Sequence, residues 1–355
     1  MKKTIIIKIG TNVITTAEGL LDIAIMEHLV GQIVALKKTG IQIILVSSGA
    51  MGAGRGLLGI SPKETVTNSQ LLAAVGQVKL MDTYQKLFEK HHMFCAQILA
   101  TKEDFRDRQH YLNMRNCFTK LLHDDIIPIA NENDVVSVQE LMFTDNDELA
   151  GMIASMMDVY KLLILTSVDG VYDKDPTQKN AKVIHTVDRQ TQWKKGITQQ
   201  RSAFGRGGMS TKCSVAGRLA QIGIETQIIN GQTKHSIIDA IEKKNIGTTF
   251  CAEKKVSNIK KRIATASGQE KGIVIVNKLA QEILTSPNHV SLLPVGIVDV
   301  IGEFQKGDII KIQNTKKEDI GIGMAQYNAE RAKEYIGQKG KKALIHYDYL
   351  FIENK

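Results

Sequence analysis

The stretch Thr4–Thr11 reads TIIIKIGT, and the rest of the chain is best interpreted from it. Four β-branched residues lead into Lys8, and Gly10 follows two positions later. Such a run predicts a short buried strand that ends in a tight turn. Glycine lets a ligand approach the backbone closely, and a lysine beside such a turn suits the terminal phosphates of a nucleotide. The octapeptide alone leaves a second interpretation open, a lysine at a strand end beside an ordinary turn.

The composition is that of an ordinary globular protein with a basic surface. The chain has 355 residues, which favours two domains, and a net charge of +9, which permits anionic ligands without identifying one. Apolar runs stay well short of the ~20 residues that a membrane-spanning helix needs, and we see no signal-peptide pattern. The four cysteines are scattered without a C-x-x-C pair, which argues against a zinc site and favours reduced thiols in the cytoplasm.

Apolar strands and amphipathic helices alternate after the first stretch. Asp22–Thr39 carries apolar residues at helical spacing and is followed by Gly40, which predicts a helix and its end. Ile41–Val46 is almost entirely apolar, as expected of a central parallel strand, and Lys161–Thr166 has the same character. This alternation predicts an α/β fold with an open, mostly parallel sheet sandwiched by helices.

Polar clusters stand where predicted strands end. The clusters are Lys8 with Gly10, Ser47–Ala50, Asn131–Asp134 and Thr166–Ser167. In open α/β sheets ligands bind outside the carboxyl ends of the strands, so we expect these clusters to converge on one crevice. Ordinary surface loops are the alternative, but the repeated coincidence favours a binding site.

A glycine-rich loop, Gly205–Lys212 (GRGGMSTK), leads into a predicted helix. Glycine N–H groups and a helix N-terminus attract phosphate, although the loop is not a Walker A motif and a flexible surface loop is the alternative. Lys8 and Lys212 would together stabilise charge that moves across the β- and γ-phosphate oxygens. Such lysines need an anchor, and Asp147 is our candidate; its alternative function is to cap a helix.

Short polar residues form a second group of candidates, namely Asn131, Asn133, Asp134 and Asn146. Amides and a carboxylate together suit a zwitterion. Asp134 would bind an α-ammonium group, and the amides or backbone donors would bind carboxylate oxygens. Taken singly, each of these residues is also a common turn former.

One motif does not fit its usual function. Gly54–Gly59 (GRGLLG) matches the G-x-G-x-x-G pattern of dinucleotide sites. It does not directly follow its strand, and no acidic residue ends a strand about 20 residues later, as that site requires. We therefore expect no dinucleotide site here.

The C-terminal part has a different character. Residues 252–270 are rich in Lys and Arg and poor in apolar residues, which predicts a basic linker or a solvated helix. Short strand-like runs then alternate with turn glycines, which predicts a small, mostly β domain. The runs are Lys271–Val276, Val290–Leu293, Ile297–Ile301, Asp308–Gln313, Ile320–Met324 and Ala343–His346. We expect an α/β domain at 1–251, a basic linker at 252–270 and a second domain at 271–355.

The motifs resemble those of the amino acid kinase family over nearly the whole chain. The matching segments are KIGTNV at Lys8–Val13, VSSGAMGAGR at Val46–Arg55, QLLAAVGQ at Gln70–Gln77, NENDVV at Asn131–Val136, DNDELA at Asp145–Ala150 and GGMSTK at Gly207–Lys212. The tail resembles the PUA domain of many bacterial members, through SLLPVGI at Ser291–Ile297 and GIG-x-x-x-Y at Gly321–Tyr327. The resemblance implies an amino acid kinase fold at 1–251 and a small β-barrel-like PUA domain at 271–355.

The resemblance also implies an activity, ATP-dependent phosphorylation of the γ-carboxylate of L-glutamate in proline biosynthesis. It assigns Lys8, Lys212 and Asp147 to catalysis. The implied substrate-binding residues are Ser48, Gly49, Ala50, Asn131, Asp134 and Asn146. The implied ATP-binding residues are Lys8, Gly10, Thr166, Ser167, Arg206, Gly207, Gly208, Met209, Ser210, Thr211 and Lys212. Mg²⁺ would be held by the ATP phosphates rather than by side chains, L-proline would be a feedback inhibitor, and the chain would form a dimer or tetramer in the cytoplasm.

The chain departs from the family pattern at two positions. Ser167 stands where the family usually has Asp, which puts one nucleotide contact in question. Arg206 stands where the family usually has Thr, and its cation either tightens nucleotide binding or faces solvent. Two other functions stay open, a sibling kinase of another carboxylate or carbamate and an RNA-binding protein acting through the tail. The tail lacks an aromatic stacking run, so we expect no nucleic-acid partner.

Overall fold

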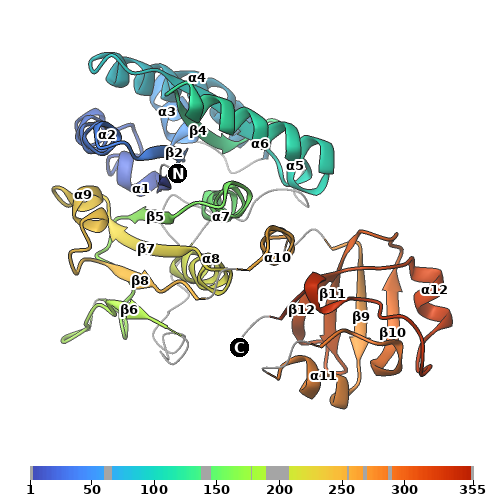
Figure 1. Cartoon of the computed structure of the whole chain (residues 1–355). Coiled ribbons are helices and arrows are strands. Elements are labelled where there is room, and N and C mark those ends of the chain that lie inside the picture. Colours follow the sequence, from blue (N-terminus) through green and yellow to red (C-terminus); the bar gives the residue numbers. More distant parts are fainter. Residues whose placement is uncertain are drawn as a thin grey trace. The chain divides into compact units, whose positions relative to one another are not determined.

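The computed structural model describes residues 3–59, 66–136, 145–176, 178–188, 208–253, 256–266, 270–286 and 290–352. The chain divides into two compact units, Met1–Lys254 and Lys255–Lys355 (Figure 1). Each unit has a hydrophobic core of its own. The division falls inside the stretch 252–270 that we expected to be a linker.

The first unit is built on one sheet, which in the described residues has eight strands in the order β3-β4-β2-β1-β5-β7-β8-β6 (Figure 1). The strands are β1 (Thr4–Ile9), β2 (Gln42–Ser47), β3 (Cys95–Ala100), β4 (Ile127–Glu132), β5 (Lys161–Thr166), β6 (Thr186–Val187), β7 (Glu225–Asn230) and β8 (Thr248–Phe250). Neighbouring strands are parallel except for the antiparallel pair β7 and β8. The predicted open, mostly parallel sheet is confirmed.

Helices cover both faces of this sheet. They are α1 (Thr11–Ile14), α2 (Ile23–Lys38), α3 (Ala50–Leu58), α4 (Val66–Glu89), α5 (Lys102–Arg106), α6 (Arg108–His123), α7 (Asn146–Met157), α8 (Met209–Gln221) and α9 (Ser236–Ile241). Apolar side chains of α2, α4 and α9 share one core with Ile5, Ile7 and Ile9 of β1. Successive residues of a strand point to opposite faces, so Lys8 points away from this core. It points toward α7, which packs against β1, β2, β4 and β5.

Glycines allow α3 and α4 to pack unusually closely. A Cβ atom on Gly76 of α4 would lie 1.7 Å from the carbonyl oxygen of Ala50 in α3. A Cβ atom on Gly54 of α3 would lie 2.0 Å from the carbonyl oxygen of Leu72 in α4. Gly54 therefore serves helix packing, and the GRGLLG segment is helical through Leu58.

The second unit holds a five-stranded sheet in the order β10-β9-β11-β12-β13 (Figure 1). Its strands are β9 (Gly272–Val276), β10 (Ile297–Gly302), β11 (Ile309–Asn314), β12 (Asp319–Met324) and β13 (Leu350–Ile352). Its helices are α10 (Asn258–Ala264), α11 (Lys278–Leu284) and α12 (Ala329–Glu334), with short 3₁₀ turns at Pro294–Gly296 and Tyr347–Tyr349. The runs expected at 290–293 and 343–346 form no strand and meet in a single bridge between Leu292 and Ile345.

The basic stretch 252–270 contains α10, which packs against β12 and β13 of the second unit. Ile263 and Ala264 of this helix are fully buried. The stretch is rich in charge, yet it forms a helix with buried apolar residues.

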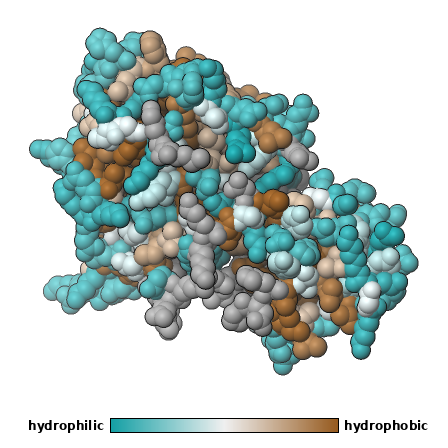
Figure 2. Space-filling view, in the orientation of Figure 1, coloured by the Kyte–Doolittle hydropathy of each residue, from teal (hydrophilic) through white to brown (hydrophobic). Residues whose placement is uncertain are grey.

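The visible face of the protein is mostly hydrophilic, and hydrophobic residues gather over α11 of the second unit (Figure 2). Leu279 and Ile283 of this helix are exposed. Within the described parts of the chain, none of the helices combines the length and the apolar character needed to cross a membrane.

We expect Gly76→Ala to destabilise the first unit by about 3 kcal/mol or more, because the added methyl group meets backbone that cannot move aside. Gly31→Ala is the matched control, since Gly31 also lies inside a helix and its Cβ would meet nothing within 4 Å. The control should be neutral or stabilise by up to about 1 kcal/mol, the helix-propensity difference. Urea unfolding measures both variants, and equal effects would contradict the close-packing explanation.

Candidate active site

The strands β1, β2, β4 and β5 are parallel, so their carboxyl ends lie at the same end of the sheet. The predicted polar clusters lie at these carboxyl ends. Gly10 follows β1 at the N-terminus of α1, and Ser48 and Gly49 follow β2 at the N-terminus of α3. Gly49 has a φ of 108°, a left-handed conformation that favours glycine. A Cβ on Gly10 would lie 3.2 Å from the carbonyl oxygen of Leu165 in β5, so the turn fits closely against the neighbouring strand.

Two lysines from distant parts of the chain meet on one carboxylate. The Nζ atom of Lys8 lies 2.6 Å from Oδ1 of Asp147, and the Nζ atom of Lys212 lies 2.8 Å from Oδ2 of the same residue. Lys8 comes from β1, Lys212 from the first turn of α8, and Asp147 from the first turn of α7. Asp147 is completely buried, and the side chains of both lysines are nearly so.

The burial of three charges is balanced electrostatically. Burial alone would raise the pKa of Asp147, but Lys8 and Lys212 outweigh it and hold that pKa well below its ordinary value. Burial lowers the pKa of Lys212, but Asp147 and Asp145 outweigh it and raise that pKa. Two ammonium groups on one carboxylate leave a net positive charge, which suits an anionic ligand.

Asp145 is the N-cap residue of α7. One oxygen, Oδ1, accepts hydrogen bonds from the N–H groups of Asp147 at 2.8 Å and Glu148 at 3.2 Å. Burial, followed by the negative charge of Asp147, raises the pKa of Asp145 to about 7. A protonated Asp145 preserves the positive charge of the lysine pair near neutral pH.

A chain of polar side chains lies beside the lysines. The Nδ2 atom of Asn146 donates to Oγ of Ser48 at 2.9 Å and to Oδ1 of Asn131 at 2.8 Å. The Nδ2 atom of Asn131 donates to Oε1 of Gln77 at 2.9 Å. Residues from β4, α7, α4 and the turn after β2 are thus joined at the same edge of the sheet.

The other predicted site residues have varied placements. Asp134 and Thr166 are partly buried after β4 and at the end of β5, and Ser167 is exposed. Gly208 is the N-cap of α8, and Met209, Ser210 and Thr211 form its first turn. Ala50 begins α3 and is buried. Arg206 and Gly207 lie outside the described residues.

Three residues near the site were not among the predicted ones, namely Asp145, Gln77 and Lys102. Lys102 at the start of α5 forms an ion pair of 3.0 Å with Glu148 of α7, and both side chains are largely buried. An aspartate directly before a predicted helix is a capping signal that identifies Asp145. Gln77 and Lys102 carry no such signal, because their partners are distant in the sequence.

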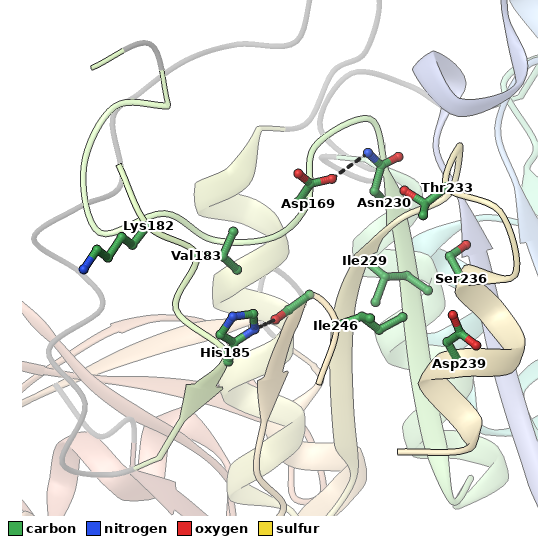
Figure 3. A pocket seen from close by; sticks show the side chains of 11 residues that line it. Asp169, Lys182, Val183, His185, Ile229, Asn230, Thr233, Ser236, Asp239 and Ile246 are labelled. Carbon is green, nitrogen blue, oxygen red and sulfur yellow. Dashed lines mark hydrogen bonds between the residues drawn. The ribbon is translucent and has the colours of Figure 1, made fainter. Parts of the chain in front are cut away.

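A separate cavity of about 570 Å³ lies between α9 and the segment after β5 (Figure 3). Asp169, His185, Asn230 and Asp239 are among the residues that line it, and neither lysine of the site does so. Asn230 donates to Asp169 at 2.9 Å, as the dashed line in Figure 3 marks. Asp239 is paired with Lys244 at 2.6 Å, so much of the polar lining is already satisfied within the protein.

Comparison with known protein families identifies the fold. Residues 3–230 match the family model described as "Amino acid kinase family", and residues 272–347 match the PUA domain. The chain belongs to the amino acid kinase family. The family resemblance stated above and the predicted PUA domain are confirmed.

Similar proteins cover almost the full length of the chain. A protein of Chlorobaculum tepidum named "Glutamate 5-kinase" is 49% identical, over 99% of this chain and 97% of its own. A protein of Bacteroides thetaiotaomicron with the same name is 43% identical, over 98% of each chain.

Solved structures with low sequence identity share the fold of the first unit. Carbamate kinase from Giardia lamblia bound to AMP-PNP has a TM-score of 0.53 at 17% identity, covering 71% of this chain and 99% of its own. Isopentenyl phosphate kinase of T. acidophilum in a product complex has a TM-score of 0.51 at 16% identity, covering 70% and 99%. These likenesses concern the fold alone.

We expect Asp145→Asn to change how stability depends on pH. In the folded protein Asp145 keeps its proton up to about pH 7, whereas its ordinary pKa is 3.8, so its contribution to stability is lost as the pH rises between these values. Asn retains the cap oxygen but does not titrate. The variant should gain stability over the wild type by on the order of 2 kcal/mol between pH 5 and pH 8.

Urea unfolding at both pH values measures this gain. Asp147 does not contribute to it, because its lowered pKa affects stability only when the pH falls below its ordinary value of 3.8. A stability difference between variant and wild type that is the same at pH 5 and pH 8 would refute the raised pKa.

Proposed function

We propose that this protein transfers the γ-phosphoryl group of ATP to the γ-carboxylate of L-glutamate. The product is L-glutamyl 5-phosphate, and the reaction is the first step of proline biosynthesis. The observation that carries the proposal is the meeting of Lys8 and Lys212 on buried Asp147 at 2.6 and 2.8 Å. The full-length similarity to proteins named glutamate 5-kinase is the reason for proposing glutamate as the phosphoryl acceptor.

The chemistry needs positioning and charge stabilisation rather than a strong base. A carboxylate oxygen of glutamate is already a nucleophile, so it attacks the γ-phosphorus without losing a proton. Negative charge then moves across the phosphate oxygens toward the leaving β-phosphate, and the two ammonium groups stabilise it. Asp147 would orient both lysines, because each of its oxygens faces one of them.

The N-terminus of α8 and the turn after β1 are the proposed seat of the phosphates. The N–H groups of Met209, Ser210 and Thr211 in the first turn of α8 have no acceptor within the helix itself and suit phosphate oxygens, and Gly10 allows close approach of the β1 turn. Thr166 and Ser167, at the end of β5, would contact the nucleotide. Arg206, Gly207 and Gly208 complete the proposed set on the family pattern.

Mg²⁺ would enter with ATP, held by oxygens of its phosphates, as hard cations prefer. Within the described residues no cluster of His, Cys, Asp or Glu side chains forms a metal-ligand set, and Asp147 faces lysines through both oxygens. The chain's side chains therefore fit a metal carried by the nucleotide. When bound, the ion would neutralise part of the negative charge of the phosphates.

The amino-acid end of the site is proposed to lie at the polar chain of Ser48, Asn131 and Asn146. Its position beside the lysine pair follows from the sequence neighbours Asn146 and Asp147 in the first turn of α7. Asp134, Gly49 and Ala50 complete the proposed set. By analogy with the family, we also propose that L-proline inhibits here, that the chain forms a dimer or tetramer, and that it acts in the cytoplasm.

The test of the function is an ATPase assay with and without L-glutamate, coupled to hydroxylamine trapping of the acyl phosphate. We expect ADP release and hydroxamate formation to depend on L-glutamate, and L-proline to lower both. Carbamate, L-aspartate and N-acetyl-L-glutamate test the sibling-kinase alternative. Faster turnover of any of these would reassign the acceptor.

We expect Lys8→Ala and Lys212→Ala each to lower kcat by about 10²-fold or more, while the KM for glutamate changes far less. The reason is that the ammonium groups stabilise charge that develops in the transition state. Lys86→Ala is the control, since Lys86 is an exposed lysine paired with Asp82 at 2.9 Å. Steady-state kinetics measure all three variants, and near-normal kcat in either site variant would count decisively against the assignment.

A further inference from the structure

A chain of hydrogen bonds, all donated in the same direction, leads from the proposed amino-acid site to β3, the outermost strand of the sheet. Asn146 donates to Ser48 and Asn131, Asn131 donates to Gln77 at 2.9 Å, and Gln77 donates to Gln97 at 3.3 Å. Asn131 and Gln77 each accept through the side-chain oxygen from the preceding amide and donate through the nitrogen to the next, and Asn131 Oδ1 also accepts from the N–H of Glu132. Every amide in the chain therefore constrains the orientation of the next one.

The orientation determines which polar atoms remain for a ligand. Both N–H bonds of the Asn146 amide are used, by Ser48 and Asn131, so its remaining polar atom is the acceptor Oδ1. This oxygen is buried and has no hydrogen-bond partner among the described residues. Ser48 Oγ accepts from Asn146, so its own hydroxyl proton is left to donate. Asn146 and Ser48 thus offer one acceptor and one donor, beside the other proposed residues, to a substrate with an ammonium and a carboxylate group.

Gln77 is the last well-anchored member of this chain. It lies next to Gly76, where α4 meets α3 at the close contact described above, so its backbone is held by packing. Gln97 on the edge strand β3 is exposed, so water can replace its contact with Gln77. Asn131, by contrast, is 4% exposed, so its Nδ2 group has little access to water as a substitute for Gln77.

We infer that Gln77 is a positioning residue for glutamate binding, acting through the amides of Asn131 and Asn146. The inference rests on the proposed function. Without the Gln77 acceptor, the buried Nδ2 group of Asn131 loses its partner, and the side chain relieves this by rotating away from Asn146. The Asn146 amide is then free to turn, and the donor and acceptor offered to the substrate are no longer in place.

The experiment compares Gln77→Leu, Gln77→Glu and Gln97→Leu with the wild type in steady-state kinetics. Gln77→Leu should raise the KM for glutamate about tenfold, the effect of one lost hydrogen bond of roughly 1.4 kcal/mol, with kcat and the KM for ATP changed by less than about threefold. Gln77→Glu should restore near-normal KM, because a carboxylate oxygen still accepts from Asn131. Gln97→Leu should resemble the wild type.

Thermal unfolding of each variant accompanies the kinetics, and Gln77→Met replaces Gln77→Leu if the latter does not fold. An unchanged glutamate KM in the apolar variant, or equal rises in the KM values for glutamate and ATP, would overturn the inference. Failure of Gln77→Glu to rescue would overturn it as well. Wild-type turnover of L-glutamate tests the proposed function separately, because the Gln77 result is a ratio between variants of the same active protein.

Discussion

The buried carboxylate of Asp147 between two ammonium groups is the constraint on which the site depends. Asp147 is completely buried, and a buried charge without partners would be very costly. Lys8 and Lys212 provide those partners, and neither lysine could be buried without the carboxylate. The three charges therefore require that β1, α7 and α8 come together at one edge of the sheet.

The strand order of the sheet helps to bring these elements together. β1 lies at the centre of the strand order, between β2 and β5, and is buried on both faces. Period-two alternation directs Ile5, Ile7 and Ile9 to the core shared with α2 and Lys8 to the opposite face, below α7. The N-termini of α7 and α8 add partial positive charge near the same edge, which complements a ligand with several phosphates.

The polar chain of Asn146, Asn131 and Gln77 is held in place by different interactions. One cause is that each side-chain amide donates a hydrogen bond to the next amide of the chain. The other is that α3 and α4 pack almost backbone to backbone at Gly54 and Gly76. Charge holds the lysine pair on Asp147, whereas the direction of the hydrogen bonds and close helix packing hold the polar chain. The two groups meet in the first turn of α7, where Asn146 and Asp147 are adjacent.

The sequence by itself determined the α/β class and the main strands of the sheet, and it singled out Lys8, Lys212 and Asp147, which the structure brings together. These are local signals, since apolar runs, helical spacing and glycine turns are each written within a few residues. The same signals were insufficient in the second unit, where 343–346 resembled a strand and forms only a bridge, and where β13 was not expected. A short strand depends on its neighbours in the sheet more than on its own composition.

Only the tertiary structure decided which side chains share a hydrogen bond, and which of the two is the donor. The distance of 2.6 Å between Lys8 and Asp147, the pKa of Asp145 near 7 and the link from Asn131 to Gln77 all join residues from separate elements. Burial and the direction of a hydrogen bond are properties of the packed chain. They arise when distant elements exclude water together, which is why no local pattern could specify them.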